Sequence, residues 1–316
     1  MSELLSRFIL LVGLGVGMAL IQPVSASKGT ASVYYAASLQ TLNETQIGPA
    51  FTRRTGYGYQ GEGLGSQLIA NEMKGGQIRP DVVEFADPAV NKTLMGSANG
   101  GYVKWYADFA RTRLVIGFNP SGKYGKLFRR VNHHHLAWYK PLLARGLRFG
   151  RTDPQIDPKG YRVLFAFRLA QRLFGLKHFA HRVLGPVEND KEIFPEQNLV
   201  AYLQTGQLDA GVFYLSEART AHIPYISLPQ KIDLGYPKYR EIYATQHFTN
   251  SQGQTFVGAP IIYTITIPKT VQDKPAAVAF VKFVLGKRAA RLSADLGLLP
   301  TKHVIRGDRR AVPPGI

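Results

Sequence analysis

The chain contains no cysteine among its 316 residues, and this absence excludes several kinds of site. Without thiols there is no disulfide, no thiolate nucleophile, no cysteine-ligated metal and no lipid on an N-terminal cysteine. An exported protein without disulfides depends on its hydrophobic core. With 45% hydrophobic residues, this chain is long enough to bury a large core and to form two domains or lobes.

Acidic residues are also few, with 21 Asp and Glu against 39 Lys and Arg, which gives a formal net charge of +18. Such a charge calls for an anionic partner or an unusual environment. Nucleic acid is the usual first candidate, but the basic residues are scattered in pairs such as Arg53-Arg54 and Arg129-Arg130 rather than gathered in one run with aromatics. We therefore expect small anions, or an acidic milieu, and no nucleic-acid partner.

Long apolar runs are missing except for Phe8 to Ile21, which is too short to span a bilayer comfortably. A short polar segment with Arg7 precedes this run, and Val24-Ser-Ala26 after it has the small-x-small form of a cleavage site. We interpret residues 1–26 as a signal peptide cut after Ala26, which implies a soluble periplasmic protein. The alternative is an uncleaved N-terminal anchor.

Several enzyme motifs are absent as well: Gly-x-Ser-x-Gly, His-Glu-x-x-His, the phosphate-binding loop and the dinucleotide fingerprint. The run His133-His134-His135 lies in a basic stretch, 126–145, that we predict to be helical. Adjacent side chains on a helix point in different directions, so these three histidines do not form one compact metal site. No motif supports an enzyme, although a spatial triad is invisible in sequence.

The first part of the mature chain alternates β-rich segments, at 31–37, 56–61 and 81–85, with helix-like stretches. This order predicts parallel pairing in an α/β sheet, whose ligands bind where the carboxyl ends of strands meet helices. Ser38 and Ser66 stand at two such ends, where each can offer a hydroxyl and nearby amides to one oxyanion. The alternative for each serine is an ordinary helix cap.

A second candidate anion site is the loop Phe149-Gly-Arg-Thr-Asp-Pro-Gln-Ile-Asp-Pro-Lys-Gly-Tyr161, which leads into an apolar-rich helix extending to Leu176. Asp157 can cap this helix and Pro158 suits its first position. Apolar residues recur every four positions along it, at Tyr161, Phe165, Leu169 and Leu173. The first turn of such a helix presents unpaired amides to whatever lies in front of it. A capped helix without a ligand is the alternative.

The ordered set of segments resembles the archaeal-type tungstate/molybdate-binding proteins, the extracellular components of ABC oxyanion importers. The matching segments follow the family's order over nearly the whole mature chain: Tyr35–Leu39, Gly65-Ser66, Asp81–Asp87, Trp105–Arg111, Phe149–Arg162, Leu208–Tyr214, Tyr225–Pro229 and Pro260–Pro268. The resemblance implies an α/β periplasmic-binding-protein type II fold. Lobe I would comprise residues 27–112 and 263–316, lobe II residues 113–262, and the crossing strands 112–118 and 260–267.

The resemblance also implies an oxyanion site, carried over position by position. Ser38 and Ser66 would bind from the first lobe, and Asp157 and Glu196 from the second. The remaining positions of the implied site are Ala37, the backbone of Lys159 and Gly160, and Tyr214. Two departures from the family bear on the geometry: Ala37 replaces a usual glycine, and Gly63-Leu64 replaces a usual Pro-Ala.

Two carboxylates facing a dianion need a physical account, because ionised Asp157 and Glu196 would repel an oxyanion held only by hydrogen bonds. They make sense as oxygen ligands to tungsten or molybdenum itself, because hard metal centres favour carboxylate oxygen. Such ligands would raise the metal from four-coordinate towards six-coordinate, which sulfur in sulfate does not allow. In the alternative, Asp157 is only a cap and Glu196 a surface acid.

We therefore predict a monomeric periplasmic receptor for tungstate or molybdate, without catalytic residues or cofactor, that serves an ABC permease and its ATPase. One alternative is a receptor for another oxyanion, such as sulfate or phosphate. A second is an exported hydrolase that uses Asp157 and Glu196 as an acid/base pair.

Overall fold

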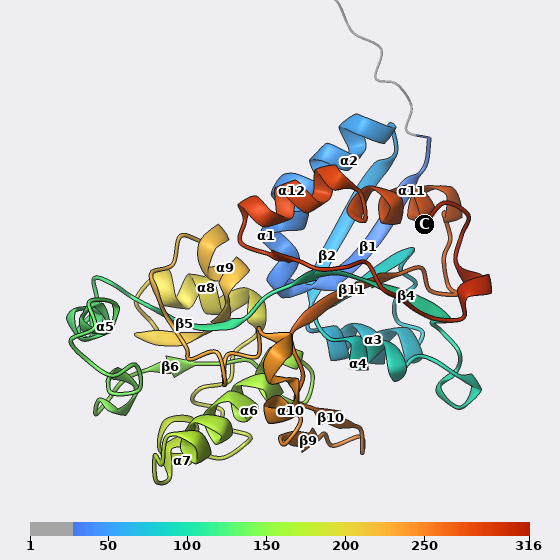
Figure 1. Ribbon diagram of the computed structural model, residues 1–316. Coiled ribbons are helices and arrows are strands. Elements are labelled where there is room, and N and C mark those ends of the chain that lie inside the picture. Colours follow the sequence, from blue (N-terminus) through green and yellow to red (C-terminus); the bar gives the residue numbers. More distant parts are fainter. Residues whose placement is uncertain (1–27) are drawn as a thin grey trace, which may run out of the picture.

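The computed structural model describes residues 28–316, and the predicted signal peptide lies outside the described residues (Figure 1). A mixed sheet of seven strands has the order β12-β4-β11-β3-β1-β2, with β13 also paired to β4. Its strands are β1 (Thr30–Ala36), β2 (Gly58–Leu64), β3 (Val82–Phe85), β4 (Trp105–Arg111), β11 (Ile262–Thr266), β12 (Leu299–Pro300) and β13 (Ile305–Gly307). We call it the first sheet.

A second sheet of four strands has the order β6-β7-β5-β8. Its strands are β5 (Leu114–Phe118), β6 (Phe149–Gly150), β7 (Ala210–Tyr214) and β8 (Tyr225–Ser227), and a separate hairpin consists of β9 (His247–Thr249) and β10 (Thr255–Val257). Two sheets, each covered by helices, give the α/β architecture predicted from the sequence.

In the first sheet, β1 pairs in parallel with both β2 and β3, which confirms the predicted parallel pairing. The antiparallel strand β11 then joins β3 to β4. On one side of this sheet lie α1 (Gln40–Leu42), α2 (Gly48–Thr55), α11 (Lys274–Val284) and α12 (Lys287–Asp295); on the other lie α3 (Ser66–Lys74) and α4 (Pro88–Lys92) (Figure 1). A π-helical turn, Asn43–Ile47, connects α1 to α2.

The second sheet is accompanied by five helices and a short one near the hairpin (Figure 1): α5 (Gly125–Asn132), α6 (Pro158–Leu173), α7 (Phe179–Leu184), α8 (Glu196–Gln204), α9 (Leu215–Thr220) and α10 (Arg240–Tyr243). Helix α6 is buried on nearly every face from Pro158 to Ala170. The predicted face of α6 is therefore buried except for Leu173, which is 38% exposed because the last turn extends beyond the core.

The predicted helix over 126–145 is wrong beyond Asn132. Helix α5 ends there in a Schellman motif: His134 adopts a positive φ of 59°, its amide donates to the carbonyl of Val131, and the amide of His135 donates to that of Arg130. Turns and a short 3-10 helix, Pro141–Leu143, follow. The histidine run is thus a helix terminus.

The chain passes between the two sheets twice, after β4 and before β11. These passages are adjacent, since the amide of Thr112 donates to the carbonyl of Ile261 (3.3 Å). The lobe boundaries at 112 and 262 and the hinge role of these segments stay predictions. Among residues 28–316, no helix is long and apolar enough to cross a membrane.

Candidate functional site

Ser38 and Ser66 lie at the carboxyl ends of β1 and β2, as predicted, and both are buried. The hydroxyl oxygen of Ser38 accepts a hydrogen bond from the Tyr263 hydroxyl (3.0 Å), and that of Ser66 accepts one from the amide of Ala86 (3.0 Å). A serine hydroxyl that accepts from the protein still has its own proton to donate. Both serines are therefore suited to donate to an anion.

Asp157 caps α6, because its Oδ1 accepts a hydrogen bond from the amide of Lys159 (2.6 Å). The amide of Gly160 donates to the Asp157 carbonyl (3.0 Å), so the two amides predicted to bind an oxyanion are both bonded to Asp157 here. The other carboxylate oxygen, Oδ2, is buried and receives no N–H donor. Capping thus uses only half of this carboxylate.

Glu196 is the first residue of α8 and is only 7% exposed, which excludes the alternative that it is a surface acid. Its Oε1 lies 2.8 Å from the Nζ of Lys159. Burial raises the pKa of Glu196, and the charge of neighbouring Asp157 raises it further. Burial also raises the pKa of Asp157. Two carboxyl groups predicted from distant parts of the sequence therefore share one desolvated site.

The side chain of Lys159 is fully buried between two carboxylates. Its Nζ lies 2.7 Å from Oε1 and 3.0 Å from Oε2 of Glu217, in addition to its contact with Glu196. These carboxylates raise the pKa of Lys159 against the effect of burial, so the ammonium stays charged. Burial raises the pKa of Glu217 to about 7.

Arg162, one turn further along α6, connects the site to the first sheet. Its guanidinium donates to the carbonyl of Ala86 (2.7 Å) and to Oδ2 of Asp87 (2.8 Å), both just after β3. It also donates to the hydroxyl of Tyr214 (2.7 Å), at the end of β7. Because the Tyr214 oxygen already accepts from Arg162, its own proton remains available to an anion.

The two sheet-bearing parts of the protein touch around this cluster. The Ile156 carbonyl accepts from the amides of Gln67 (3.1 Å) and Leu68 (3.2 Å), and the side chain of Gln197 donates to the Gly63 carbonyl (2.9 Å). Only glycine fits at position 65, because an added Cβ would lie 2.7 Å from the Ile156 oxygen. The site is therefore built by both parts where they are in direct contact.

Two pockets at this boundary share Glu196. One, of about 290 Å³, is lined by Gly65, Asp157 and Glu196 among others, and the second, of about 320 Å³, by Ala37, Ser38, Glu196 and Glu217 among others. Among residues 28–316 no group of three or more His, Asp or Glu side chains is arranged to hold a metal ion.

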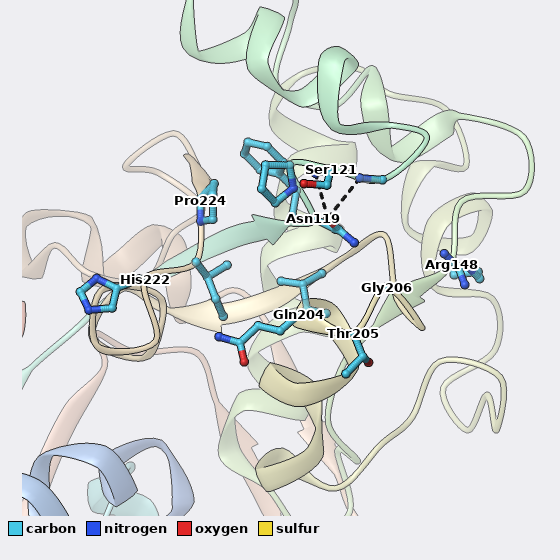
Figure 2. Close-up of a pocket in the computed structure, with 13 residues that line it drawn as sticks. Asn119, Ser121, Arg148, Gln204, Thr205, Gly206, His222 and Pro224 are labelled. Carbon is cyan, nitrogen blue, oxygen red and sulfur yellow. Dashed lines mark hydrogen bonds between the residues drawn. The ribbon is translucent and has the colours of Figure 1, made fainter.

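A larger pocket, of about 520 Å³, lies at the opposite end of β5 and β7 (Figure 2). It contains no predicted site residue, and two of its polar side chains already bond to the protein. The side-chain oxygen of Asn119 accepts from the amides of Ser121 and Gly122, and Arg148 pairs with Asp209 at 2.8 Å. We do not include it in the candidate site.

Comparison with known proteins identifies the family. A family profile described as bacterial extracellular solute-binding protein matches residues 31–298. The chain belongs to this family. Solute-binding proteins serve transport and are not an enzyme class, and the family's extracellular description agrees with an exported protein.

Several relatives of this solute-binding protein are similar over most of their length. An uncharacterized solute-binding protein of Petrotoga mobilis is 30% identical over 276 residues (85% of this chain, 83% of the relative). A putative ABC transporter molybdenum-binding protein of Haloferax volcanii is 34% identical over 238 residues (75% and 72%). The molybdate/tungstate-binding protein WtpA of Thermococcus kodakarensis is 26% identical over 254 residues (74% and 70%). These relatives confirm the resemblance inferred from sequence.

Solved structures confirm the periplasmic-binding-protein fold. The periplasmic molybdate-binding protein of Azotobacter vinelandii matches with a TM-score of 0.56 and 17% identity, covering 85% of this chain and 99% of that one. The sulfate-binding protein SubI of Mycobacterium tuberculosis matches with a TM-score of 0.56 and 14% identity, covering 87% and 88%. At these identities the likeness concerns the fold alone.

Sequence reasoning missed three side chains of this solute-binding protein's site: Lys159, Arg162 and Glu217. Lys159 and Arg162 lie inside the family-like segment Phe149–Arg162, but only the backbone of Lys159 is predicted from it to bind. A signal for Glu217 is its place three residues after Tyr214, whose amide donates to Glu217 Oε2 (2.7 Å) as in a capping box. The pattern is hard to recognise in the sequence because the cap residue is a tyrosine rather than a serine or threonine.

Proposed function

We propose that this solute-binding protein binds tungstate or molybdate between its two sheets and delivers the anion to a membrane permease and its ATPase. Two relatives whose names include molybdate, tungstate or molybdenum, at 26–34% identity over about three quarters of the chain, support the ligand class. Export to the periplasm after signal-peptide cleavage is part of this proposal.

The observation that carries the proposal is the buried Oδ2 of Asp157, which receives no N–H donor and is paired only with the carboxyl group of Glu196, so that this contact depends on a shared proton. Leaving a buried carboxylate oxygen without such a donor is costly unless something else binds it. Tungsten or molybdenum in the oxyanion would be that partner, because such a metal centre accepts carboxylate oxygen. The oxyanion's own oxygens would accept hydrogen bonds from Ser38, Ser66 and Tyr214.

The charge balance fits an anion only with this kind of bonding. One ammonium, Lys159, lies near three buried carboxyl groups, Asp157, Glu196 and Glu217, so an added dianion would meet excess negative charge whenever these groups are ionised. Direct coordination of the carboxylates to the metal would turn that repulsion into bonding. Sulfate and phosphate offer no such coordination and would be repelled.

Calorimetry with tungstate, molybdate, sulfate and phosphate tests the proposal. We expect binding of the first two and at least about tenfold weaker binding of the others, a difference of roughly 1.4 kcal/mol. Equal or stronger binding of sulfate would contradict coordination by the carboxylates. X-ray fluorescence of the protein as purified would show independently whether tungsten or molybdenum accompanies it.

A further inference from the structure

A long segment of the chain is nearly free of acidic residues. Between Phe109 and Val187 there are 16 Lys and Arg but only two carboxylates, Asp153 and Asp157, and acidic residues return at Glu188. Three of these cations, Arg151, Lys159 and Arg162, are buried and paired inside the protein. Most of the others are exposed, so their positive charge faces outward.

Four of the exposed cations lie in the segments next to an apolar tip where α6 ends. Leu173 is 38% and Phe174 is 42% exposed, and in the part of the chain that the structure describes only Val257 and Val304 are other large hydrophobic residues with such exposure. We call Leu173 and Phe174, together with the exposed Lys140, Arg172, Lys177 and Arg182, the basic pole.

Ring contacts hold the members of the basic pole near one another. Trp138 contacts Phe174 (ring centroids 6.3 Å apart) and Phe179 of α7 (5.7 Å), so the segment that carries Lys140 packs against α7 and the end of α6. Lys177 lies in the connection between α6 and α7, and Arg182 lies on α7. The cations and the apolar tip therefore share one region of the surface.

The basic pole is distant from the oxyanion site. Asp157 caps the first turn of α6, whereas the pole begins at its last turn, and a 16-residue helix is about 24 Å long. Figure 1 shows α7 at the extremity of the second part of the molecule, away from the first sheet. A partner bound at the pole would leave the site accessible.

We propose that the basic pole docks on a bilayer surface that contains anionic phospholipids. Exposed Leu and Phe next to several Lys and Arg is the composition that binds a membrane interface: the apolar side chains enter the headgroup boundary and the cations remain among the anionic headgroups. The two carboxylates of this segment, Asp153 and Asp157, precede α6 at the end away from the pole, which limits the repulsion that such a surface would otherwise meet. Docking would concentrate the receptor at the membrane, where its permease lies.

Vesicle sedimentation tests the proposal, with vesicles of phosphatidylcholine alone and with 30% phosphatidylglycerol. We expect the protein to bind the anionic vesicles, to bind neutral vesicles at least about tenfold more weakly, and to dissociate as salt screens the cations. The variant Lys140→Gln/Lys177→Gln/Arg182→Gln should lose at least about tenfold in vesicle affinity, and Leu173→Ser/Phe174→Ser should also bind more weakly.

A matched control separates this surface from net charge alone. The variant Lys287→Gln/Arg288→Gln/Arg291→Gln also removes three positive charges, but from exposed positions on α12, and it should keep vesicle binding. Equal losses in both triple variants, or equal binding to neutral and anionic vesicles, or no vesicle binding at all, would overturn the proposal. Tungstate binding should be unchanged in all three variants, so this test fails or succeeds independently of the proposed function.

Discussion

Positive charges are buried and paired at the start of α6, whereas they are exposed near its end. At its start, Lys159 and Arg162 are buried, and each contacts carboxylates: Glu196 and Glu217 for the lysine, Asp87 for the arginine. Arg172 in its last turn and Lys177 in the connection that follows are exposed, and no carboxylate pairs with them among the ion pairs of residues 28–316. The two ends of this helix therefore lie in a buried cluster of paired charges and beside an open basic surface.

Buried and exposed charges have different effects on a protein. A buried charge is tolerated only with partners in good geometry, so it fixes the positions of the groups around it. An exposed charge contributes little to stability but acts at a distance on anions. We infer that the first cluster shapes the oxyanion site and that the second sets where the whole protein resides. The following substitutions test that division.

The largest expected effect is the loss of the buried ammonium. Lys159→Met keeps most of the side-chain volume but leaves Glu196 and Glu217 buried without their cation, which should lower the free energy of unfolding by about 3–5 kcal/mol. Urea denaturation at pH 8 would measure it. Lys177→Met is the matched control at the exposed end and should change stability by no more than about 0.5 kcal/mol. Similar values for both variants would remove the distinction between the two ends.

The sequence predicted the parts of this molecule that depend on local pattern. Strand–helix alternation gave the parallel pairing of β1 with β2 and β3, and it identified Ser38 and Ser66 at the ends of two strands. The Asp-Pro pair predicted the start of α6, including its cap. These features follow from residues only a few positions apart, which is why they could be predicted.

Features that local sequence pattern does not reveal could not be predicted in this way. Glu217 follows Lys159 by 58 positions and has no periodicity that points to it. The helix predicted over 126–145 ends at Asn132 instead, and three consecutive polar residues gave no sign that His134 would take a left-handed conformation. Leu173 matched the four-residue spacing of the core face, yet spacing alone does not say where a helix leaves the core.

A buried carboxyl group without a cation offers a contrast with Glu217. Glu84 is 1% exposed, accepts a hydrogen bond from the side-chain NH2 group of Asn43 (2.6 Å), and burial raises its pKa to about 7. The folded state therefore keeps a proton that the unfolded state loses near its ordinary pKa of 4.5. Its contribution to stability is fully present below pH 4.5 and is lost as the pH rises through 7.

Glu84→Gln removes this titration while keeping the amide hydrogen bond. We expect the stability of the variant, relative to the natural chain, to rise by roughly 3 kcal/mol between pH 4.5 and pH 8, because 2.5 pKa units correspond to about that free energy. Urea denaturation across this pH range would measure the difference. A constant difference would show that Glu84 titrates normally.

The next prediction separates the cap from the ligand at Asp157. Asparagine caps a helix as well as aspartate does, so Asp157→Asn should keep stability within about 1 kcal/mol. Its binding of tungstate should nevertheless weaken at least about tenfold, roughly 1.4 kcal/mol, because the charged Oδ2 is lost. Asp273→Asn at the cap of α11 is the control, since Asp273 also accepts from its first turn (3.0 Å) but lies outside the site. Unchanged tungstate affinity in Asp157→Asn would show that Asp157 only caps α6 and does not bind the anion.

The smallest expected effect comes from the contact between the two parts of the protein rather than from a charge. In Gly65→Ala the new methyl group would lie 2.7 Å from the Ile156 oxygen, so the loop before α6 must move away from α3. We expect tungstate binding to weaken about fivefold, near 1 kcal/mol, measured by calorimetry. In the control Gly75→Ala, at the other end of α3, the nearest atom is at 3.5 Å and affinity should not change. If Gly65→Ala also leaves affinity unchanged, the close approach at Ile156 is not required for binding, and the charged cluster alone must hold the anion.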